Sequence, residues 1–107
     1  MRRWQGASPR ERWNPADFTD LPALRSRWND VETETARYLA GLDEGELDRD
    51  ISYVNFAGQT WRYPLWQQMM HQVNHATQHR SEAALLLTQA GHSPGDLDFL
   101  RYFDALS

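Results

Sequence analysis

Three histidines spaced four residues apart, His71, His75 and His79, are the side chains of this sequence best suited to chemistry. Residues at i and i+4 lie about one turn apart on one face of an α-helix, and neutral imidazole is the commonest metal ligand in proteins. His71 and His79 would lie roughly 12 Å apart along the helix axis, too far to share one ion whose bonds to nitrogen are about 2.0–2.1 Å long. The spacing therefore predicts that one adjacent pair binds a divalent metal, with further ligands from elsewhere.

The same histidines also have ordinary structural interpretations. A pair of histidines at i and i+4 is by itself a weak signal, and the imidazoles can equally be surface groups or hydrogen-bonded core groups. Glu82 falls within the same sector of the helix as His75 and His79, although a lone helix glutamate is more often solvated than a ligand. His92 follows the predicted helix and is interpreted as a loop residue near the negative end of the helix dipole.

Two long helices are predicted to position these residues. In the first, Asp20 is the expected N-cap with Pro22 in the first turn, and one apolar stripe follows with steps of three and four. That stripe consists of Leu21, Leu24, Trp28, Val31, Thr35, Tyr38 and Leu42. The second helix is expected from Pro64 to Gly91, because proline suits a first helical turn and glycine suits the position after the last. Its histidines lie beside an apolar arc, on the shoulder of the expected core face, and metal sites in helical bundles are built from residues that project inward from facing helices.

The remaining segments are predicted to be short. Residues 51–63 are rich in β-branched and aromatic residues around a glycine and predict a hairpin with strands near 51–56 and 60–63. Two strands are marginally stable alone, so the hairpin must pack against helices. Residues 1–20 are expected to be irregular, residues 43–50 to form one helical turn, and residues 96–106 a last short helix. The expected fold class is mainly α.

Length and composition narrow the possible functions. A chain of 107 residues predicts a single domain over residues 1–107. The net charge of −4 and the lack of a basic block argue against nucleic acid as the partner. There is no cysteine, which excludes disulfides and thiolate ligands. No signal peptide and no apolar run of about 20 residues is present, so we expect a cytoplasmic protein without a membrane anchor.

The segment from His71 to Glu82, HQVNHATQHRSE, resembles the signature of the DinB family, the DinB/YfiT-like superfamily, in which Asn-His is followed after three residues by His-Arg. The surrounding sequence is similar as well, with a Tyr-x-Asn…Gly hairpin, then Pro-Leu-Trp before the helix, and Gly-His-Ser-Pro-Gly-Asp-Leu-Asp after it. This resemblance covers nearly the whole chain.

The resemblance implies an up-down-down-up four-helix bundle that binds a divalent metal, commonly nickel, zinc or iron, through three histidines. Two of these correspond to His75 and His79, while the third lies on an earlier helix, ahead of the point where this sequence begins. Trp4-Gln5-Gly6 resembles the end of that earlier helix. We therefore expect a chain that lacks the first helix and most of the second, through a misassigned start codon or as a true short form. The metal is either held by the remaining pair or lost.

Relatives of this kind imply a metal-dependent hydrolase or a thiol-dependent transferase in the response to damage or stress. The metal would activate water or a small-molecule thiol at an open position, and Glu82 would orient a ligand histidine or act as a fourth ligand. The alternatives are a non-catalytic homodimeric module and an inactive fragment. A homodimer is expected in any case, because both long helices and the Leu85-Leu86-Leu87 run present apolar surface that needs a partner.

Overall fold

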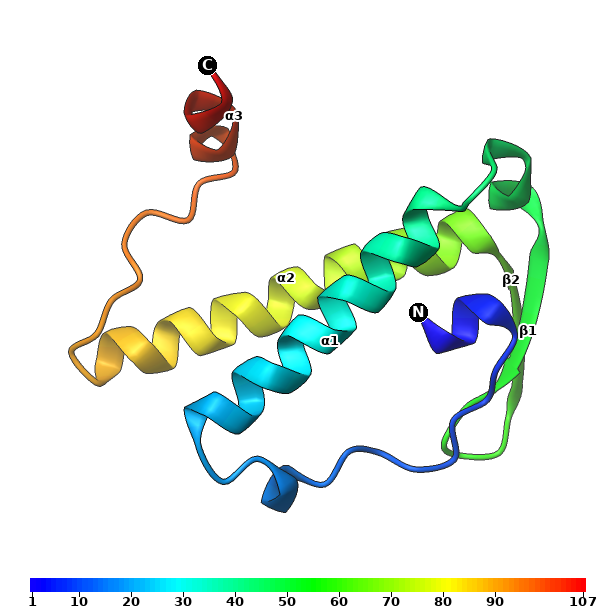
Figure 1. Cartoon of the computed structure of the whole chain (residues 1–107), viewed down its shortest axis with the longest axis horizontal. Coiled ribbons are helices and arrows are strands. Elements are labelled where there is room, and N and C mark those ends of the chain that lie inside the picture. The colour runs from blue at the N-terminus through cyan, green and yellow to red at the C-terminus, as the bar shows by residue number, and fades with distance from the viewer. The chain divides into compact units, whose positions relative to one another are not determined.

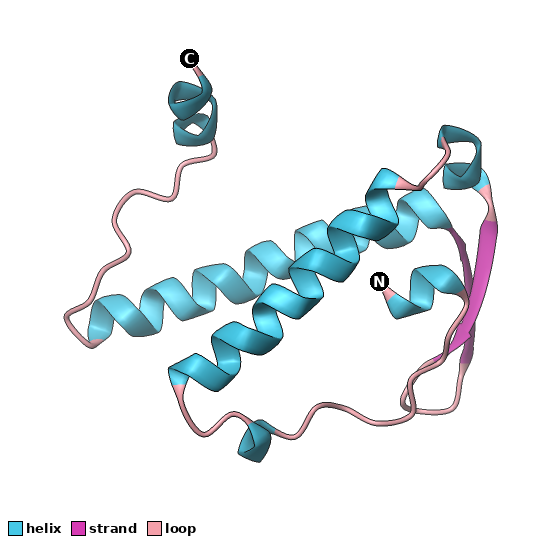
Figure 2. Ribbon diagram, viewed as in Figure 1, coloured by secondary structure: helices cyan, strands magenta, loops and turns pink.

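The computed structural model describes all 107 residues, and helices dominate it (Figures 1 and 2). Its regular elements are the helices α1 (Leu21–Ala40), α2 (Leu65–Gln89) and α3 (Leu100–Leu106), the strands β1 (Asp50–Val54) and β2 (Thr60–Pro64), and the short 3₁₀ turns Arg2–Gln5, Pro15–Asp17 and Glu44–Asp48. The predicted mainly helical class with a small hairpin is therefore confirmed. Two compact units, Met1–Met70 and His71–Ser107, make up the chain, and α2 runs across their boundary.

Helix α1 begins as the sequence predicts. The Asp20 carboxylate accepts a hydrogen bond of 2.8 Å from the Ala23 amide, which satisfies one of the free N–H groups at the helix start. Pro22 lies in the first turn, where its missing N–H costs no helical hydrogen bond. At the other end the Gly41 amide bonds to carbonyls of the last turn. The helix therefore ends at Ala40, two residues before the end of the apolar stripe at Leu42.

The hairpin pairs β1 and β2 in antiparallel register, with Asp50 opposite Pro64 and Val54 opposite Thr60. The predicted strand 51–56 ends two residues early because Asn55 starts the turn instead. Its side-chain oxygen accepts bonds of 2.9 Å from the amides of Ala57 and Gln59, a local arrangement that competes with the strand ladder. The backbone of Gly58, at φ +80°, completes the turn in a conformation that favours glycine.

The core of the first unit lies where this hairpin meets the first turn of α2. Ile51 is 5% exposed and Leu65 is fully buried. Gln68, the one buried polar residue, donates its side-chain N–H groups to the carbonyls of Ile51 at 3.0 Å and Tyr63 at 3.1 Å. The Leu65 amide bonds to the Arg49 carbonyl at 3.0 Å. The hairpin is therefore supported by a helix, as its small size requires.

The N-terminal segment, predicted to be irregular, contacts the hairpin through specific groups. The Ser8 hydroxyl accepts a 2.9 Å bond from the amide of Val54 at the edge of β1. The Arg3 guanidinium lies 4.7 Å from the ring centre of Tyr53, a cation–π distance. Trp4 packs against Tyr38 with ring centres 6.0 Å apart. These contacts attach residues 1–8 to the first unit.

The second unit consists of most of α2, a connecting segment and α3. Gly91, with φ +81°, ends α2 as the sequence predicts, and the His92 amide bonds to the Leu87 carbonyl at 2.8 Å. The helix α3 begins at Leu100 rather than near Asp96, because the carboxylates of Asp96 and Asp98 accept bonds from amides two residues on and hold a turn.

None of the side chains in the second unit is buried. The Leu85-Leu86-Leu87 run is exposed by 58, 66 and 46% respectively, so this unit by itself does not supply the burial that the sequence predicts for the run. None of the helices combines the length and the apolar character that crossing a bilayer requires.

Candidate metal site on helix α2

His75 and His79 lie against each other on one face of α2. Their ring centres are 4.5 Å apart, with the ring planes nearly perpendicular at 89°. The Nε2 atom of each ring points to the other ring, and the two Nε2 atoms are 3.0 Å apart. This proximity follows directly from the spacing of four residues on a continuous helix.

The separation of the two Nε2 atoms matches that of neighbouring ligands on one metal ion. Two nitrogens each about 2.1 Å from an ion and about 90° apart around it would be separated by about 3.0 Å. A tetrahedral angle would require only a few tenths of an ångström more. The distance between the two nitrogens thus suits one divalent ion, although both rings would have to turn from pointing at each other to pointing at the ion.

Glu82 contacts one of these rings. Its Oε2 lies 3.1 Å from Nδ1 of His79, and its Oε1 accepts a long bond of 3.4 Å from the Gln78 side-chain amide. An ionised carboxylate only accepts hydrogen bonds, so the proton of a neutral His79 ring is on Nδ1 and its Nε2 carries the lone pair. The bond between the two rings then has His75 as the donor, from Nε2–H.

The other two histidines do not join this arrangement. His71 stacks on His75 with ring centres 5.6 Å apart and an angle of 15° between the planes, and neither of its ring nitrogens makes a hydrogen bond. His92 lies beyond the end of α2, in the loop expected for it. No group of three or more His, Cys, Asp or Glu side chains is arranged to hold a metal ion. The histidine pair alone supplies at most two ligands.

The site is open to solvent, since the side chains of His79 and Glu82 are 60% and 57% exposed. A charge interaction at such a position is weakened by water and salt. Sequence reasoning missed the contact from Gln78 that supports Glu82. Its signal was present, because Gln78 and Glu82 are also separated by four residues and lie on neighbouring turns.

The fold and the site define a class of mainly helical proteins in which a β-hairpin precedes a long helix, and this helix carries Asn-His followed after three residues by His-Arg. The model of the DinB family matches residues 3–106, so this chain belongs to the DinB family. The match extends over both compact units, while the single-domain organisation predicted for residues 1–107 stays a prediction. No curated protein and no solved structure matches the chain.

Proposed function

We propose that this chain binds one divalent metal ion, of the nickel, zinc or iron type, through the Nε2 atoms of His75 and His79. The observation that carries the proposal is the convergence of these two atoms to 3.0 Å. Membership of the DinB family, some of whose members bind metal, supports it. When bound, the metal would supply Lewis-acid activation of water or of a small-molecule thiol, which is the chemistry of the hydrolases and thiol transferases proposed for this family.

Glu82 prepares one of the two ligands for the ion. By accepting the Nδ1–H of His79 at 3.1 Å, its carboxylate leaves Nε2 of that ring with its lone pair, which accepts the bond from His75 in the metal-free protein and would bind the ion in the metal-bound one. Carboxylate partners of this kind fix the tautomer and the ring orientation of a ligand histidine. His75 has no such partner, so its proton must leave Nε2 before both rings can bind the same ion. Only His79 of the pair therefore has the tautomer that binds a metal through Nε2.

The number of ligands limits what one chain does chemically. Catalytic zinc usually has three protein ligands and an open position, whereas one chain of this protein presents two adjacent imidazoles. We expect metal binding without significant hydrolase or thiol-transferase turnover by a single chain. Robust turnover by a preparation of monomers would contradict this assignment.

Calorimetric titration with Ni²⁺ and Zn²⁺ tests the proposed ligands. His75→Ala and His79→Ala should each abolish stoichiometric binding, because one imidazole on an exposed helix holds an ion weakly. The matched controls are His71→Ala, one turn away on the same helix, and His92→Ala in the loop, and both should bind as the unaltered protein does. Retained binding by the double variant His75→Ala, His79→Ala would sink the proposal.

The role of Glu82 has a separate readout. Removal of such a partner typically weakens metal affinity by about 10–100-fold, so we expect this loss for Glu82→Ala. Glu82→Gln keeps an acceptor oxygen but not the charge, so its metal affinity should lie between those of Glu82→Ala and the unaltered protein. Nitrogen NMR of the metal-free protein should show His79 protonated on Nδ1 and His75 on Nε2, and Glu82→Ala should abolish the preference at His79. An unchanged tautomer would show that Glu82 does not orient this ring.

A further inference from the structure

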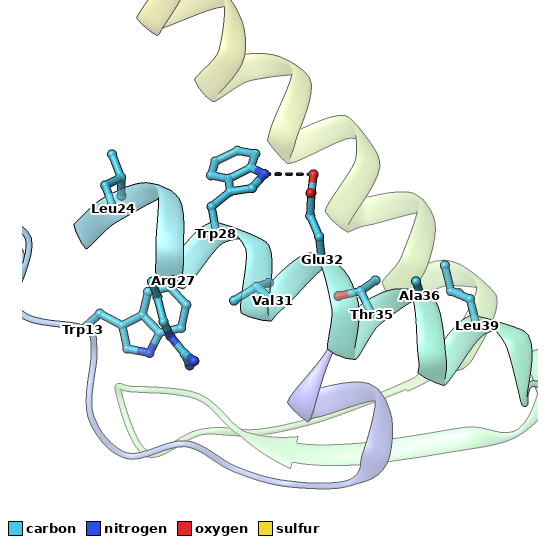
Figure 3. Close-up of a pocket in the computed structure, with 9 residues that line it drawn as sticks. All are labelled: Trp13, Leu24, Arg27, Trp28, Val31, Glu32, Thr35, Ala36 and Leu39. Atoms are coloured by element: carbon cyan, nitrogen blue, oxygen red, sulfur yellow. Dashed lines mark hydrogen bonds between the residues drawn. The ribbon is translucent and has the colours of Figure 1, made fainter. Parts of the chain in front are cut away.

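Helix α1 carries an apolar groove of about 470 Å³ that lies entirely within the first unit. Trp13 from the preceding segment and Leu24, Trp28 and Val31 from α1 line it (Figure 3). Leu24, Trp28 and Trp13 remain 45, 61 and 56% exposed, although they are the largest apolar side chains of this face. Surface of this kind is usually covered in a soluble protein.

The exposed apolar area of this face is about half of what each partner of a standard dimer interface buries. Trp13, Trp28, Leu24 and Leu39 are each about half exposed, so side chains of roughly 200 Å² each would leave about 400 Å² of apolar surface open. A standard stable interface buries about 800 Å² on each partner. These four side chains would supply about half of it.

We propose that a second copy of this chain covers the groove, with the two α1 helices antiparallel about a two-fold axis between residues 29 and 30. In this register Trp28 lies opposite the partner's Val31, and Leu24 lies opposite the partner's Thr35. Each pair occurs twice, as a two-fold interface requires. The bulky residues in the first half of the helix thereby meet the smaller ones in its second half.

The charges at the two edges of the apolar stripe select the antiparallel orientation. At about 100° per residue, Arg25 and Glu32 lie on one edge of the stripe, and Arg27 and Glu34 lie on the other. Antiparallel helices related by such an axis bring equal edges together. Arg25 then faces the partner's Glu32 and Arg27 faces the partner's Glu34, each with an offset of about 3 Å along the axis.

A parallel pair would instead bring opposite edges together. Arg25 would then lie beside the partner's Arg27, and Glu32 beside the partner's Glu34, which places like charges next to each other. Within the chain, Arg25 and Glu34 make no salt bridge. One oxygen of Glu32 accepts a 2.9 Å bond from the Trp28 ring nitrogen, which leaves its second oxygen for the partner.

Sedimentation equilibrium at micromolar concentration tests the pairing. The unaltered chain should have the mass of a dimer. Arg25→Glu should raise the dimer dissociation constant by about tenfold or more, because it places acid against acid at two positions. Arg25→Glu combined with Glu32→Arg should recover most of this loss. Ser26→Glu, on the opposite face of α1, is the control and should leave the mass unchanged. A monomeric mass for the unaltered chain, or loss without recovery in the charge-swapped variant, would overturn the proposal.

Spin labels test the orientation independently of affinity, because the chain has no cysteine and each added one is unique. Asn29 and Ala40 lie on the same outer side of α1. An antiparallel pair centred between residues 29 and 30 places the two Asn29→Cys labels almost level along the axis, and the two Ala40→Cys labels about 32 Å apart along it. A parallel pair would give both variants nearly the same distance. Equal distances for the two variants would therefore also refute the antiparallel arrangement.

Discussion

The two compact units of this chain differ in what holds them and in what they offer chemically. The first unit contains every buried side chain, namely Ile51, Leu65 and Gln68. The second unit contains the proposed metal ligands, yet none of its side chains is buried, and the ring of His79 hydrogen-bonds only with His75 and Glu82 on neighbouring turns of the same helix. The buried core therefore lies in the first unit and the candidate metal ligands lie in the second.

Because of this separation, the side chains of the candidate site are not part of the buried core. Most stability of a helix in a protein comes from packing of an apolar face, and the residues around His75 have little such packing within their unit. Changes at the core should consequently alter stability strongly, whereas changes at the histidines should leave the metal-free fold nearly as it is.

The largest effect is expected at Gln68. In Gln68→Leu the carbonyls of Ile51 and Tyr63 lose their donor in a buried position, and each unsatisfied group costs about 1–3 kcal/mol. We expect a loss of about 2–4 kcal/mol in the free energy of unfolding, measured in urea. Gln67→Leu, at the exposed neighbouring position, should change it by less than about 0.5 kcal/mol. Equal stability of the two variants would remove the distinction between the units.

Hydrogen exchange should make the same comparison residue by residue. Amides that hold the first unit together, such as that of Leu65, should exchange at least about tenfold more slowly than those between His75 and Glu82, where few apolar groups are buried. Ni²⁺ at about 100 times the dissociation constant should stabilise the folded state relative to the unfolded state by about 2.7 kcal/mol. The added protection should concentrate around the histidine pair. Uniform protection of both segments before metal addition would contradict the comparison.

Tyr38 offers a smaller effect of the opposite sign. Its hydroxyl is buried without a hydrogen-bond partner, so Tyr38→Phe removes an unsatisfied group and should raise stability by about 0.5–1 kcal/mol. Thermal unfolding near neutral pH measures this gain. Destabilisation by Tyr38→Phe would show that the hydroxyl has a partner in solution.

The same tyrosine predicts a pH dependence. Burial raises the pKa of Tyr38, and the nearby Glu46 carboxylate adds to the rise while Arg49 opposes it. The folded pKa therefore exceeds the unfolded value of about 10. Stability from this group is fully present below pH 10 or so and is lost as the pH rises further. Tyr38→Phe should accordingly lose less stability than the unaltered protein between neutral and strongly alkaline pH, as measured by urea unfolding.

The smallest effect is expected at Asp96 in the second unit. The Asp98 amide, and after it the Arg101 guanidinium, lower the pKa of the Asp96 carboxyl. Its contribution is therefore present above the unfolded pKa of about 3.9 and is lost as the pH falls through the lower, folded value. In the unaltered protein, protonation of Asp96 at acid pH should shift the NMR signals of Asp98 and Arg101. Asp96→Asn should remove these shifts without altering global unfolding. A change in the global transition would mean that α3 belongs to the cooperative fold.

The local elements could be predicted from the sequence because their signals are local. Asp20 and Pro22 set the start of α1, and Gly91 sets the end of α2, through backbone groups within a few residues. The hairpin was predictable from its composition. The pairing of His75 with His79 was also predictable, because any continuous helix brings residues four apart together.

Tertiary structure decided what the periodicity cannot express. Gln68 lies in the same helical sector as His75 and His79, yet it is buried and they are exposed, because the hairpin strands present two carbonyls at its position alone. Tyr38 packs against Trp4, which is distant in sequence, and its hydroxyl is buried without a hydrogen-bond partner. Sequence therefore determined which side chains share a helix face, through the fixed geometry of the helix. Only the contacts between distant segments decided which of them are buried, since those contacts depend on backbone groups that no local pattern encodes.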